Sequence, residues 1–315
     1  MKALVTGGAG FIGSHICEAL CRRGAKVVVL DNLSTGNLHN LDWKKPGDEI
    51  EFAQGEVADE ALVKKLVAGC DWVFHEAAQP SVPLSVAQPM QTNRDNLDAS
   101  LGLLVAARDA GVKRFMFASS SAVYGDSEAP LKHESHGVCP ISPYGLQKYA
   151  AERYGQLFHQ LYGFEAISFR YFNVFGPRQS FDSPYSGVIA KFCTLLLQGT
   201  APKIFGDGLQ TRDYVYVQNV VNANLLAAEG DAAKVAGKVF NVGCGESIDL
   251  LQLTAELNRQ TGQNLAPVHM PPRTGDIKHS AADISAARAG LNYVPEVTWQ
   301  KGLEHTLDFY RAGNK

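Results

Sequence analysis

The sequence predicts an α/β fold in which a doubly wound parallel sheet is joined to a smaller α/β lobe. Three observations predict it. Short runs of β-branched residues alternate with longer helical patterns from residue 2 onward, a glycine-rich segment follows the first run, and the alternation ends at about Gly176. Strands that alternate with helices in this way form a parallel sheet that is covered on both faces.

The first part of the chain supplies these elements in order. Strands are expected at residues 2–7, 26–31, 50–55, 71–78, 114–120 and 166–176, and helices at residues 11–24, 59–69 and about 142–162. In the first helix, Ile12, Ile16, Ala19 and Leu20 recur with helical spacing, so they form one apolar stripe, and Gly24 ends the helix.

The chain after Gly176 has a different texture. Residues 176–187 have the composition of a loop, and short strands and helices follow without strict alternation. A helix at residues 217–228 and a strand at residues 239–243 are expected to return to the main sheet. The sequence therefore predicts a first domain at residues 1–175, completed by about 216–245, and a smaller lobe formed mainly by residues 176–215 and 246–315.

Composition and charge exclude several function classes. A formal net charge of -3, with Lys+Arg 29 against Asp+Glu 32, offers no basic excess for nucleic acid and no polybasic run for a membrane surface. No window approaches about 20 apolar residues and no signal-peptide core precedes the first glycines, so a cytoplasmic location is expected. The six cysteines contain no C-x-x-C pair and are expected to be buried, reduced thiols. No histidine has metal-site spacing, so no metal is assigned.

The glycine-rich segment is typical of a dinucleotide site. Gly7, Gly8, Gly10 and Gly13 lie between the first strand and the first helix and satisfy G-x-G-x-x-G. Glycines let the backbone approach a pyrophosphate, whose charge is met by the positive end of the helix. Asp31 ends the second strand about twenty residues later, where its carboxylate can bind the adenosine ribose and repel a 2′-phosphate. The pattern predicts NAD rather than NADP as the cofactor.

A tyrosine and a lysine suggest the chemistry. Tyr144 and Lys148 are spaced i, i+4 after Pro143, so they share one face of a helix. An ammonium group one turn away is expected to lower the pKa of the phenol, which could then take a hydroxyl proton while a hydride leaves the same carbon. The hydroxyls of Ser119, Ser120 and Ser121 follow a strand at its carboxyl end, where open α/β sheets bind ligands, and are expected to orient the reacting group.

With these motifs the chain resembles an extended short-chain dehydrogenase/reductase, most closely a nucleotide-sugar 4-epimerase of the UDP-galactose/UDP-N-acetylglucosamine type. The resemblance covers nearly all 315 residues and rests on GGAGFIGSH, DNLSTG, HEAA, SSSAVYG, SPYGLQK, RYFNVFGPRQ, GDGLQTRDYVYV and RTGDIKHSAADIS. It implies a Rossmann domain, a substrate-binding lobe and tightly held NAD. It also implies abstraction of the sugar O4 proton by Tyr144, transfer of the C4 hydride to NAD, rotation of the 4-keto sugar, and hydride return to its other face.

The resemblance also implies a set of site residues. The catalytic residues would be Ser120, Ser121, Tyr144 and Lys148. The cofactor would contact Tyr144, Lys148 and a longer set, namely Gly7, Gly10, Phe11, Ile12, Gly13, Asp31, Asn32, Leu33, Ser34, Thr35, Gly36, Glu56, Val57, Ala77, Ala78, Gln79, Asn96, Tyr171 and Phe172. Glu56 replaces an aspartate that is usual beside the adenine. The UDP-sugar would contact Ser81, Ser120, Tyr144, Asn173, Val188, Lys191, Phe205, Arg212, Arg273, Asp276 and Ser280, with Arg212 and Arg273 holding the diphosphate.

Enzymes of this family that catalyse other reactions carry different residues at several of these positions. Related 4,6-dehydratases carry an Asp-Glu pair after the catalytic threonine, and this chain has Ser121 and Ala122 there. UDP-glucuronate 4-epimerases commonly carry an arginine where this chain has Ser180, although Lys191 could supply the charge, so a uronic acid substrate stays an alternative. Ser280 falls where epimerases of plain hexoses tend to carry tyrosine. This favours UDP-GlcNAc/UDP-GalNAc, with UDP-glucose/UDP-galactose as a second pair.

Two further expectations concern partners. Members of this family commonly form a homodimer through a four-helix bundle, to which about Thr92–Ala110 and Ser142–Tyr162 would contribute here. Leu97, Leu101, Leu104 and Val105 could serve that interface or the core equally well. A non-catalytic NAD-binding scaffold of the same fold is the remaining alternative, which intact Ser120, Tyr144 and Lys148 argue against.

Overall fold

The computed structural model describes residues 1–127, 129–181, 187–272 and 278–313 of the chain. A seven-stranded sheet forms the larger part, in the order β3–β2–β1–β4–β5–β6–β11, and each neighbouring pair is parallel. Its strands are β1 (Lys2–Thr6), β2 (Lys26–Asp31), β3 (Ile50–Gln54), β4 (Trp72–His75), β5 (Arg114–Ser120), β6 (Glu165–Tyr171) and β11 (Val239–Val242). The predicted doubly wound α/β fold is confirmed.

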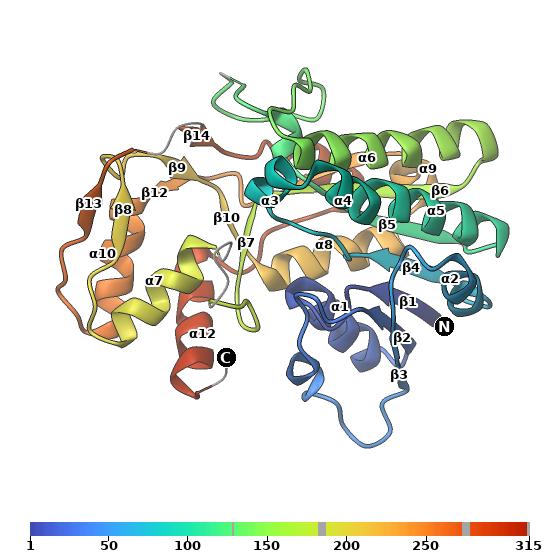
Figure 1. Ribbon diagram of the computed structural model, residues 1–315, viewed down its shortest axis with the longest axis horizontal. Coiled ribbons are helices and arrows are strands. Elements are labelled where there is room, and N and C mark those ends of the chain that lie inside the picture. Colours follow the sequence, from blue (N-terminus) through green and yellow to red (C-terminus); the bar gives the residue numbers. More distant parts are fainter. Residues whose placement is uncertain (128, 182–186, 273–277, 314–315) are drawn as a thin grey trace.

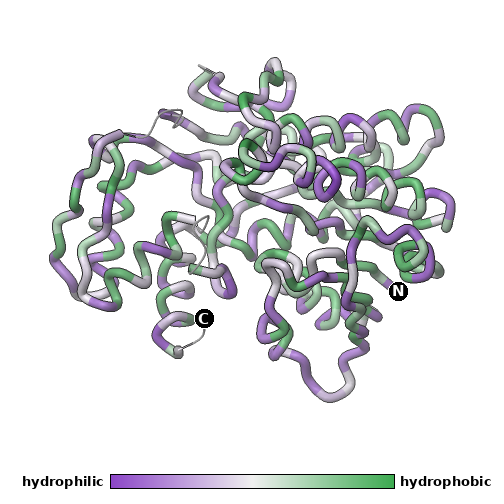
Figure 2. The backbone as a smooth tube through the Cα atoms, viewed as in Figure 1, coloured by the Kyte–Doolittle hydropathy of each residue, from purple (hydrophilic) through white to green (hydrophobic). Residues whose placement is uncertain are grey.

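Helices cover both faces of this sheet (Figure 1). One face packs against α1 (Phe11–Arg22), α8 (Val217–Glu229) and α11 (Ser285–Leu291), and the other against α2 (Glu60–Val67), α5 (Ala99–Asp109) and α6 (Pro143–Tyr162). Figure 2 shows hydrophobic and hydrophilic residues interleaved along these helices, as expected for elements with one buried face. The predicted stripe of the first helix is part of this core, since Ile16 and Leu20 are fully buried.

Short elements complete this larger part. They are η1 (Leu38–Leu41), α3 (Val82–Ala87), α4 (Pro89–Asn93), the π-helical turn η2 (Arg94–Asp98), the 3-10 turn η3 (Ser121–Tyr124) and α9 (Ala232–Val235). The helix expected from about Thr92 to Ala110 therefore begins earlier and contains a π turn. Such turns insert an extra residue and are frequent near functional sites.

The smaller lobe has a core of its own (Figure 1). It contains β7 (Asn173–Phe175), α7 (Val188–Leu197), β8 (Lys203–Phe205), β9 (Thr211–Arg212), β10 (Tyr214–Tyr216), β12 (Ile248–Asp249), α10 (Leu250–Thr261), β13 (Val268–Met270), β14 (His279–Ser280) and α12 (Trp299–Arg311). The β7–β10 and β8–β13 pairs are parallel, and β9 lies between β12 and β14.

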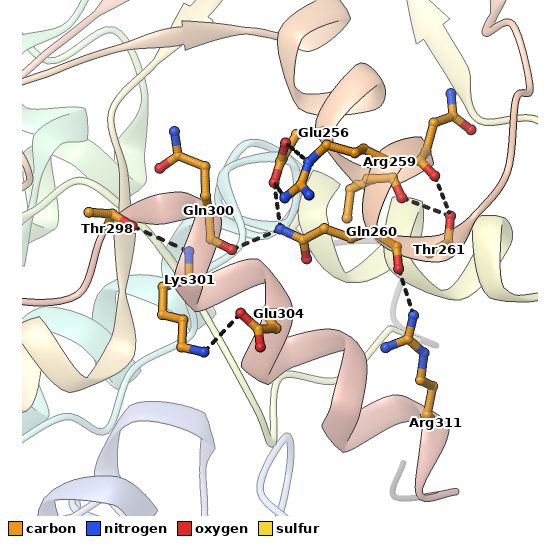
Figure 3. A network of polar contacts seen from close by, with 11 residues as sticks. Glu256, Arg259, Gln260, Thr261, Thr298, Gln300, Lys301, Glu304 and Arg311 are labelled. Atoms are coloured by element: carbon orange, nitrogen blue, oxygen red, sulfur yellow. Dashed lines mark hydrogen bonds and ion pairs between the residues drawn. The ribbon is translucent and has the colours of Figure 1, made fainter.

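Polar contacts join α10 to α12 within the smaller lobe (Figure 3). Gln260 donates to the carbonyl oxygen of Gln300 (2.9 Å), and Arg311 donates to the carbonyl oxygen of Gln260 (2.9 Å). Arg259 pairs with Glu256 within α10. These contacts lie on the surface, so they join two helices without forming part of the core.

Two expectations of local structure are wrong. The single strand expected at residues 166–176 is interrupted at Phe172, because β6 stays in the main sheet while β7 leaves it to pair with β10. The six cysteines are all free thiols, but Cys139 is exposed and Cys244 is only partly buried. Among the described residues no helix is long and apolar enough to span a membrane.

Candidate functional site

A cavity of about 870 Å³ lies at the carboxyl ends of β1, β2 and β4. The strand order reverses between β1 and β4, and open α/β sheets bind ligands at such a switch point. Fifteen of the predicted cofactor residues line the cavity: Gly7, Gly10, Phe11, Ile12, Gly13, Asp31, Asn32, Ser34, Thr35, Gly36, Glu56, Val57, Ala77, Ala78 and Gln79. The structure therefore brings most of the predicted nucleotide residues to one surface.

The glycine-rich loop has no space for side chains. Gly7 has a φ of 67°, and a Cβ atom there would lie 2.7 Å from the backbone nitrogen of Ala77. A Cβ atom on Gly13 would lie 2.2 Å from the carbonyl oxygen of Gly7. The first turn of α1 thus packs directly on the loop, and backbone N–H groups and the helix N-terminus face the cavity, as a diphosphate requires.

Asp31 is fixed at the end of β2. Its two carboxylate oxygens accept hydrogen bonds from the backbone N–H groups of Ala9 (3.0 Å) and Leu33 (2.8 Å). Each oxygen keeps a lone pair that can accept a ribose hydroxyl. Nearby, Asn32 donates to Glu56 (3.0 Å), so Glu56 also lines the nucleotide end of the cavity. The donor and acceptor set fits NAD.

The predicted catalytic residues lie together in the interior. Pro143 begins α6 behind the N-cap Ser142, and a Cβ atom on Gly145 would lie 2.7 Å from the carbonyl oxygen of Ala122. This close approach brings Tyr144 to Ser120 at the end of β5. The Ser120 hydroxyl accepts from the backbone N–H of Ala122 (3.1 Å) and is hydrogen-bonded to the Tyr144 phenol.

The three serines have different surroundings. Ser119 donates to Glu152 (3.0 Å) and is buried, whereas Ser120 contacts Tyr144. Ser121 begins the 3-10 turn and is half-buried. Of these three, Ser120 is thus the one placed to orient a group that Tyr144 acts upon.

The expected effect of Lys148 on Tyr144 is wrong for the protein alone. Burial raises the pKa of Tyr144, and the hydrogen bond with Ser120 is what opposes that rise. Lys148 instead donates to the carbonyl oxygen of Ala118 (2.8 Å), and its ammonium group lies 5.0 Å from the centre of the Phe117 ring. Burial lowers the pKa of Lys148 to about 8, and the charge of Glu76 acts against that shift.

Glu76 is a site residue that the sequence reasoning missed. It follows β4 directly and lines the cavity, and its carboxylate accepts a hydrogen bond from the Tyr171 hydroxyl (3.0 Å). Burial raises its pKa to about 7. The signal was available in the motif HEAA, since an acidic residue directly after a buried strand occupies the ligand edge of the sheet.

The remaining predicted cofactor residues lie behind the cavity wall. Asn96, in the π turn, accepts from the backbone N–H of Gln79 (2.7 Å) and donates to Gln147 (2.9 Å), so it supports the lining from behind. Tyr171 and Phe172 are buried, and Leu33 is half-buried with a φ of 60°. Tyr144 and Lys148 likewise do not line this cavity.

The predicted substrate residues divide between the cavity and the smaller lobe. Ser81, Asn173 and Val188 line the cavity. Lys191 lies one turn further along α7, and Phe205 ends β8. Arg212 and Ser280 are partners in the β9–β14 pairing. Arg273 and Asp276 lie outside the described residues.

Asp213 is a second residue that the sequence reasoning missed. It is fully buried and accepts from the backbone N–H groups of Cys244 (2.8 Å), Gly245 (3.0 Å) and Ala282 (3.2 Å). These bonds join the residue between β9 and β10 to the loop after β11 and to the segment after β14, which carries Ser280. Its carboxylate therefore fixes the backbone next to Arg212, and burial raises the pKa of this carboxyl to about 6.

Comparisons with known proteins agree with this geometry. The model of the NAD dependent epimerase/dehydratase family matches residues 3–243. The structure of UDP-N-acetylglucosamine 4-epimerase from Methanobrevibacter ruminantium, in complex with UDP-N-acetylmuramic acid, is 40% identical, with a TM-score of 0.93 and coverage of 99% of this chain and 98% of that chain. UDP-glucose 4-epimerase from Thermotoga maritima, with UDP-glucose, is 39% identical, with a TM-score of 0.93 and coverage of 99% of both chains.

A third structure bears on the cofactor. UDP-glucose 4-epimerase from Thermus thermophilus in complex with NAD is 36% identical, with a TM-score of 0.87 and coverage of 99% of both chains. These similarities confirm the predicted fold, the predicted family and the prediction of NAD as the cofactor.

Proposed function

This chain belongs to the NAD dependent epimerase/dehydratase family, and we propose that it inverts C4 of UDP-hexoses through a transient 4-keto sugar. We propose UDP-GlcNAc and UDP-GalNAc as the main pair and UDP-glucose and UDP-galactose as a second pair. The observation that carries the proposal is the contact of Ser120 with Tyr144 at the carboxyl end of β5, beside the buried Lys148.

NAD, when bound, supplies the hydride acceptor and returns the hydride. The chain supplies the rest. Tyr144 holds the proton of the sugar O4, and Ser120 holds the oxygen in place because its own oxygen already accepts from Ala122 and its proton is free to donate. Lys148 is held by the carbonyl oxygen of Ala118 at the end of β5 and brings a positive charge to the region of the catalytic residues. Ser121 lies beside Ser120 as a second hydroxyl.

The residues around Ser120 favour epimerisation over dehydration. Water elimination needs a further acid and base beside the reacting carbons, and the positions after Ser120 are Ser121 and Ala122. Neither side chain can act as the acid or the base of an elimination at neutral pH. The sugar therefore keeps its hydroxyls, and return of the hydride completes the reaction.

The choice of an acetylated sugar rests on Ser280. This residue lies opposite Arg212 in the β9–β14 pairing, and a small side chain there leaves space beside a residue proposed to hold the diphosphate. Replacing Ser280 with tyrosine should remove most activity on UDP-GlcNAc and spare UDP-glucose. Equal losses on both sugars would show that Ser280 does not line the acetamido pocket.

A substrate panel tests the reaction itself. UDP-hexoses, UDP-N-acetylhexosamines and UDP-uronic acids are incubated at equal concentration with the purified protein, and anomeric NMR signals report the product sugar. The proposal expects GlcNAc–GalNAc interconversion as the fastest. Preference for UDP-glucuronate would assign the uronate reaction instead, and no product from any sugar would favour a scaffold.

We also propose a homodimer. Leu146, Leu157 and Leu161 on α6 are 58%, 38% and 67% exposed, and the spacing of 146, 157 and 161 places them on one helical face. Met90 on α4 is 71% exposed. Exposed apolar groups of this kind suit a helical interface. Sedimentation of the protein and of a Leu157→Glu, Leu161→Glu variant should give a dimer and a monomer.

A further inference from the structure

Tyr144 is held from two sides. On the side of β5 its phenol meets Ser120, and a Cβ atom on Gly145 would lie 2.7 Å from the carbonyl oxygen of Ala122. On the other side α3 packs against α6, and the Ser85 hydroxyl oxygen accepts a hydrogen bond from the backbone N–H of Tyr144 (3.1 Å). Ser85 thus contacts the backbone of the residue whose side chain meets Ser120.

The position of Tyr144 in its helix shows why this hydrogen bond matters. The first N–H groups of an α-helix have no partner within the helix. In α6 the N-cap Ser142 accepts from the N–H of Gly145 (3.1 Å), and Pro143 has no N–H to satisfy. The N–H of Tyr144 lies between them, and Ser85 supplies its acceptor from another element. Loss of the acceptor of a buried N–H is costly, so this bond fixes the first turn of α6.

The Ser85 hydroxyl has a defined orientation. It donates its proton to the carbonyl oxygen of Val82 (2.7 Å), so its oxygen accepts from Tyr144. Ser85 is fully buried, and its own N–H donates to the carbonyl oxygen of Ser81 (3.0 Å). Because a serine hydroxyl has one proton, these contacts fix both its donor role and its acceptor role.

Helix α3 also reaches the cavity. Its N-cap Ser81 lines the cavity, and the Ser81 hydroxyl accepts from the backbone N–H of Leu84 (3.0 Å). Ser81 and Ser85 are about one helical turn apart. The helix therefore joins the cavity wall directly to the backbone of Tyr144.

A second anchor lies about one turn further along α6. The Gln147 side chain donates to the Thr92 hydroxyl (3.1 Å) and accepts from Asn96 (2.9 Å), and all three side chains are buried. This anchor remains when the Ser85 hydroxyl is removed. Loss of that hydroxyl should therefore release the first turn of α6 without detaching the helix.

We propose that Ser85 is a positioning residue for proton transfer, which holds the Tyr144 phenol beside Ser120. The inference rests on the proposed function in taking Tyr144 as the residue that accepts the sugar proton. Displacement of a reacting group by about 1 Å can lower a rate about 100-fold, so a contact with the backbone of Tyr144 is enough to control the rate.

Ser85→Ala tests both the contact and its consequence. Hydrogen exchange of the Tyr144 amide, followed by NMR, should become about tenfold faster because the acceptor is lost. On whichever UDP-sugar the parent turns over, kcat should fall about 10–100-fold while KM stays within about threefold. Ser85→Thr keeps the hydroxyl, so amide exchange and kcat should both stay within about threefold of the parent.

Thr306→Val is the matched control. Thr306 on α12 is fully buried and donates to the carbonyl oxygen of Gly302 (2.7 Å), so it is a buried helix hydroxyl in the smaller lobe. This variant should leave kcat and the exchange of the Tyr144 amide unchanged, even where its Tm falls as much as that of Ser85→Ala. A purely structural role for Ser85 would give the same kcat in the two variants.

Three results would overturn the inference. They are unchanged exchange of the Tyr144 amide in Ser85→Ala, faster exchange with unchanged kcat, and an equal fall of kcat in Thr306→Val. If the parent turns over no UDP-sugar, the proposed function fails, and the exchange of the Tyr144 amide still decides whether Ser85 holds the tyrosine. The two failures are therefore distinguishable.

Discussion

The two ends of the cavity are built from different materials. At the nucleotide end the surface is backbone, with Gly7 and Gly13 so close to their neighbours that a single Cβ atom does not fit. At the catalytic end the Glu76 side chain lines the cavity and is held by Tyr171, with Lys148 buried behind the wall. Steric fit determines what binds at the nucleotide end, and charged side chains determine the chemistry at the catalytic end. Each end should therefore respond to a different kind of substitution.

A buried polar framework supports the catalytic end. Arg170 donates to Glu152 through two nitrogens (3.0 and 2.7 Å), and Ser119 donates to the same carboxylate. The Arg170 guanidinium lies 4.7 Å from the centre of the Tyr124 ring, and the Tyr124 hydroxyl donates to Asn241 (2.6 Å). The framework joins β5, β6, β11 and α6, and so it fixes the strand end that carries Ser120.

The largest effect is expected from Tyr144→Phe. Loss of the phenol should lower kcat by about 10²–10⁴-fold, since no neighbour can replace its proton transfer. The NAD dissociation constant should stay within about threefold, because the nucleotide end is untouched. Initial rates on UDP-GlcNAc and calorimetry with NAD measure the two quantities. Tyr162→Phe, at the exposed end of α6, is the control and should behave as the parent.

Removing one charge from the buried framework should lower the stability of the protein by a large amount. Glu152→Gln leaves the buried Arg170 guanidinium without its ion-pair partner, and the free energy of unfolding should fall by about 3–5 kcal/mol. Urea unfolding followed by circular dichroism measures it.

The surface pair Glu256–Arg259 on α10 (Figure 3) is the matched control. Its arginine side chain is 69% exposed, so Glu256→Gln should cost less than about 1 kcal/mol. Similar losses in the two variants would mean that burial does not distinguish the two ion pairs.

A substitution at the backbone-lined nucleotide end should give a smaller effect, which is a loss of NAD affinity and not of kcat. Gly13→Ala places a methyl group against the Gly7 carbonyl, and the resulting strain of about 1–3 kcal/mol should weaken NAD binding about 10–100-fold. At saturating NAD the kcat should approach that of the parent. Gly137→Ala, where a Cβ atom meets nothing within 4 Å, should leave both unchanged. A lowered kcat at saturating NAD would show that the two ends are not independent.

The same division explains what the sequence could predict. The glycine loop, Asp31 and the sheet follow from local patterns, because glycine spacing and strand alternation report backbone geometry directly. Tyr144 and Lys148 were found by helical spacing. The pKa of Tyr144 could not be predicted from that spacing. Burial of the phenol and the direction of the Lys148 side chain depend on β5 and β4 as much as on α6.

Residues that act through distant partners left weaker signals. Asp213 contacts backbone at residues 244, 245 and 282, and Glu76 depends on Tyr171 and Asn224, which lie far away in sequence. No local period predicts such contacts. The break at Phe172 is similar, because the partner that draws β7 out of the sheet is β10, about forty residues later.

The smallest predicted effect concerns pH and stability. Because burial raises the pKa of Glu76 from 4.5 to about 7, the folded protein binds this proton more tightly than the unfolded chain does. The contribution of this carboxyl to the unfolding free energy therefore falls as pH rises from about 4.5 to about 7 and is constant above that range. Glu76→Gln has no carboxyl to titrate at this position. From about pH 5 to pH 8 the unfolding free energy of the variant should therefore rise relative to that of the parent by on the order of 1 kcal/mol.

Urea unfolding of both proteins at the two pH values measures this difference. Asp213, whose pKa burial raises to about 6, titrates in the same range in both proteins and cancels in the comparison. A gap between the variants that does not change with pH would mean that the Glu76 carboxyl has the same pKa in the folded and unfolded chain. In that case charge would not set the catalytic end of the cavity, and the contrast with the backbone-lined end would be one of shape alone.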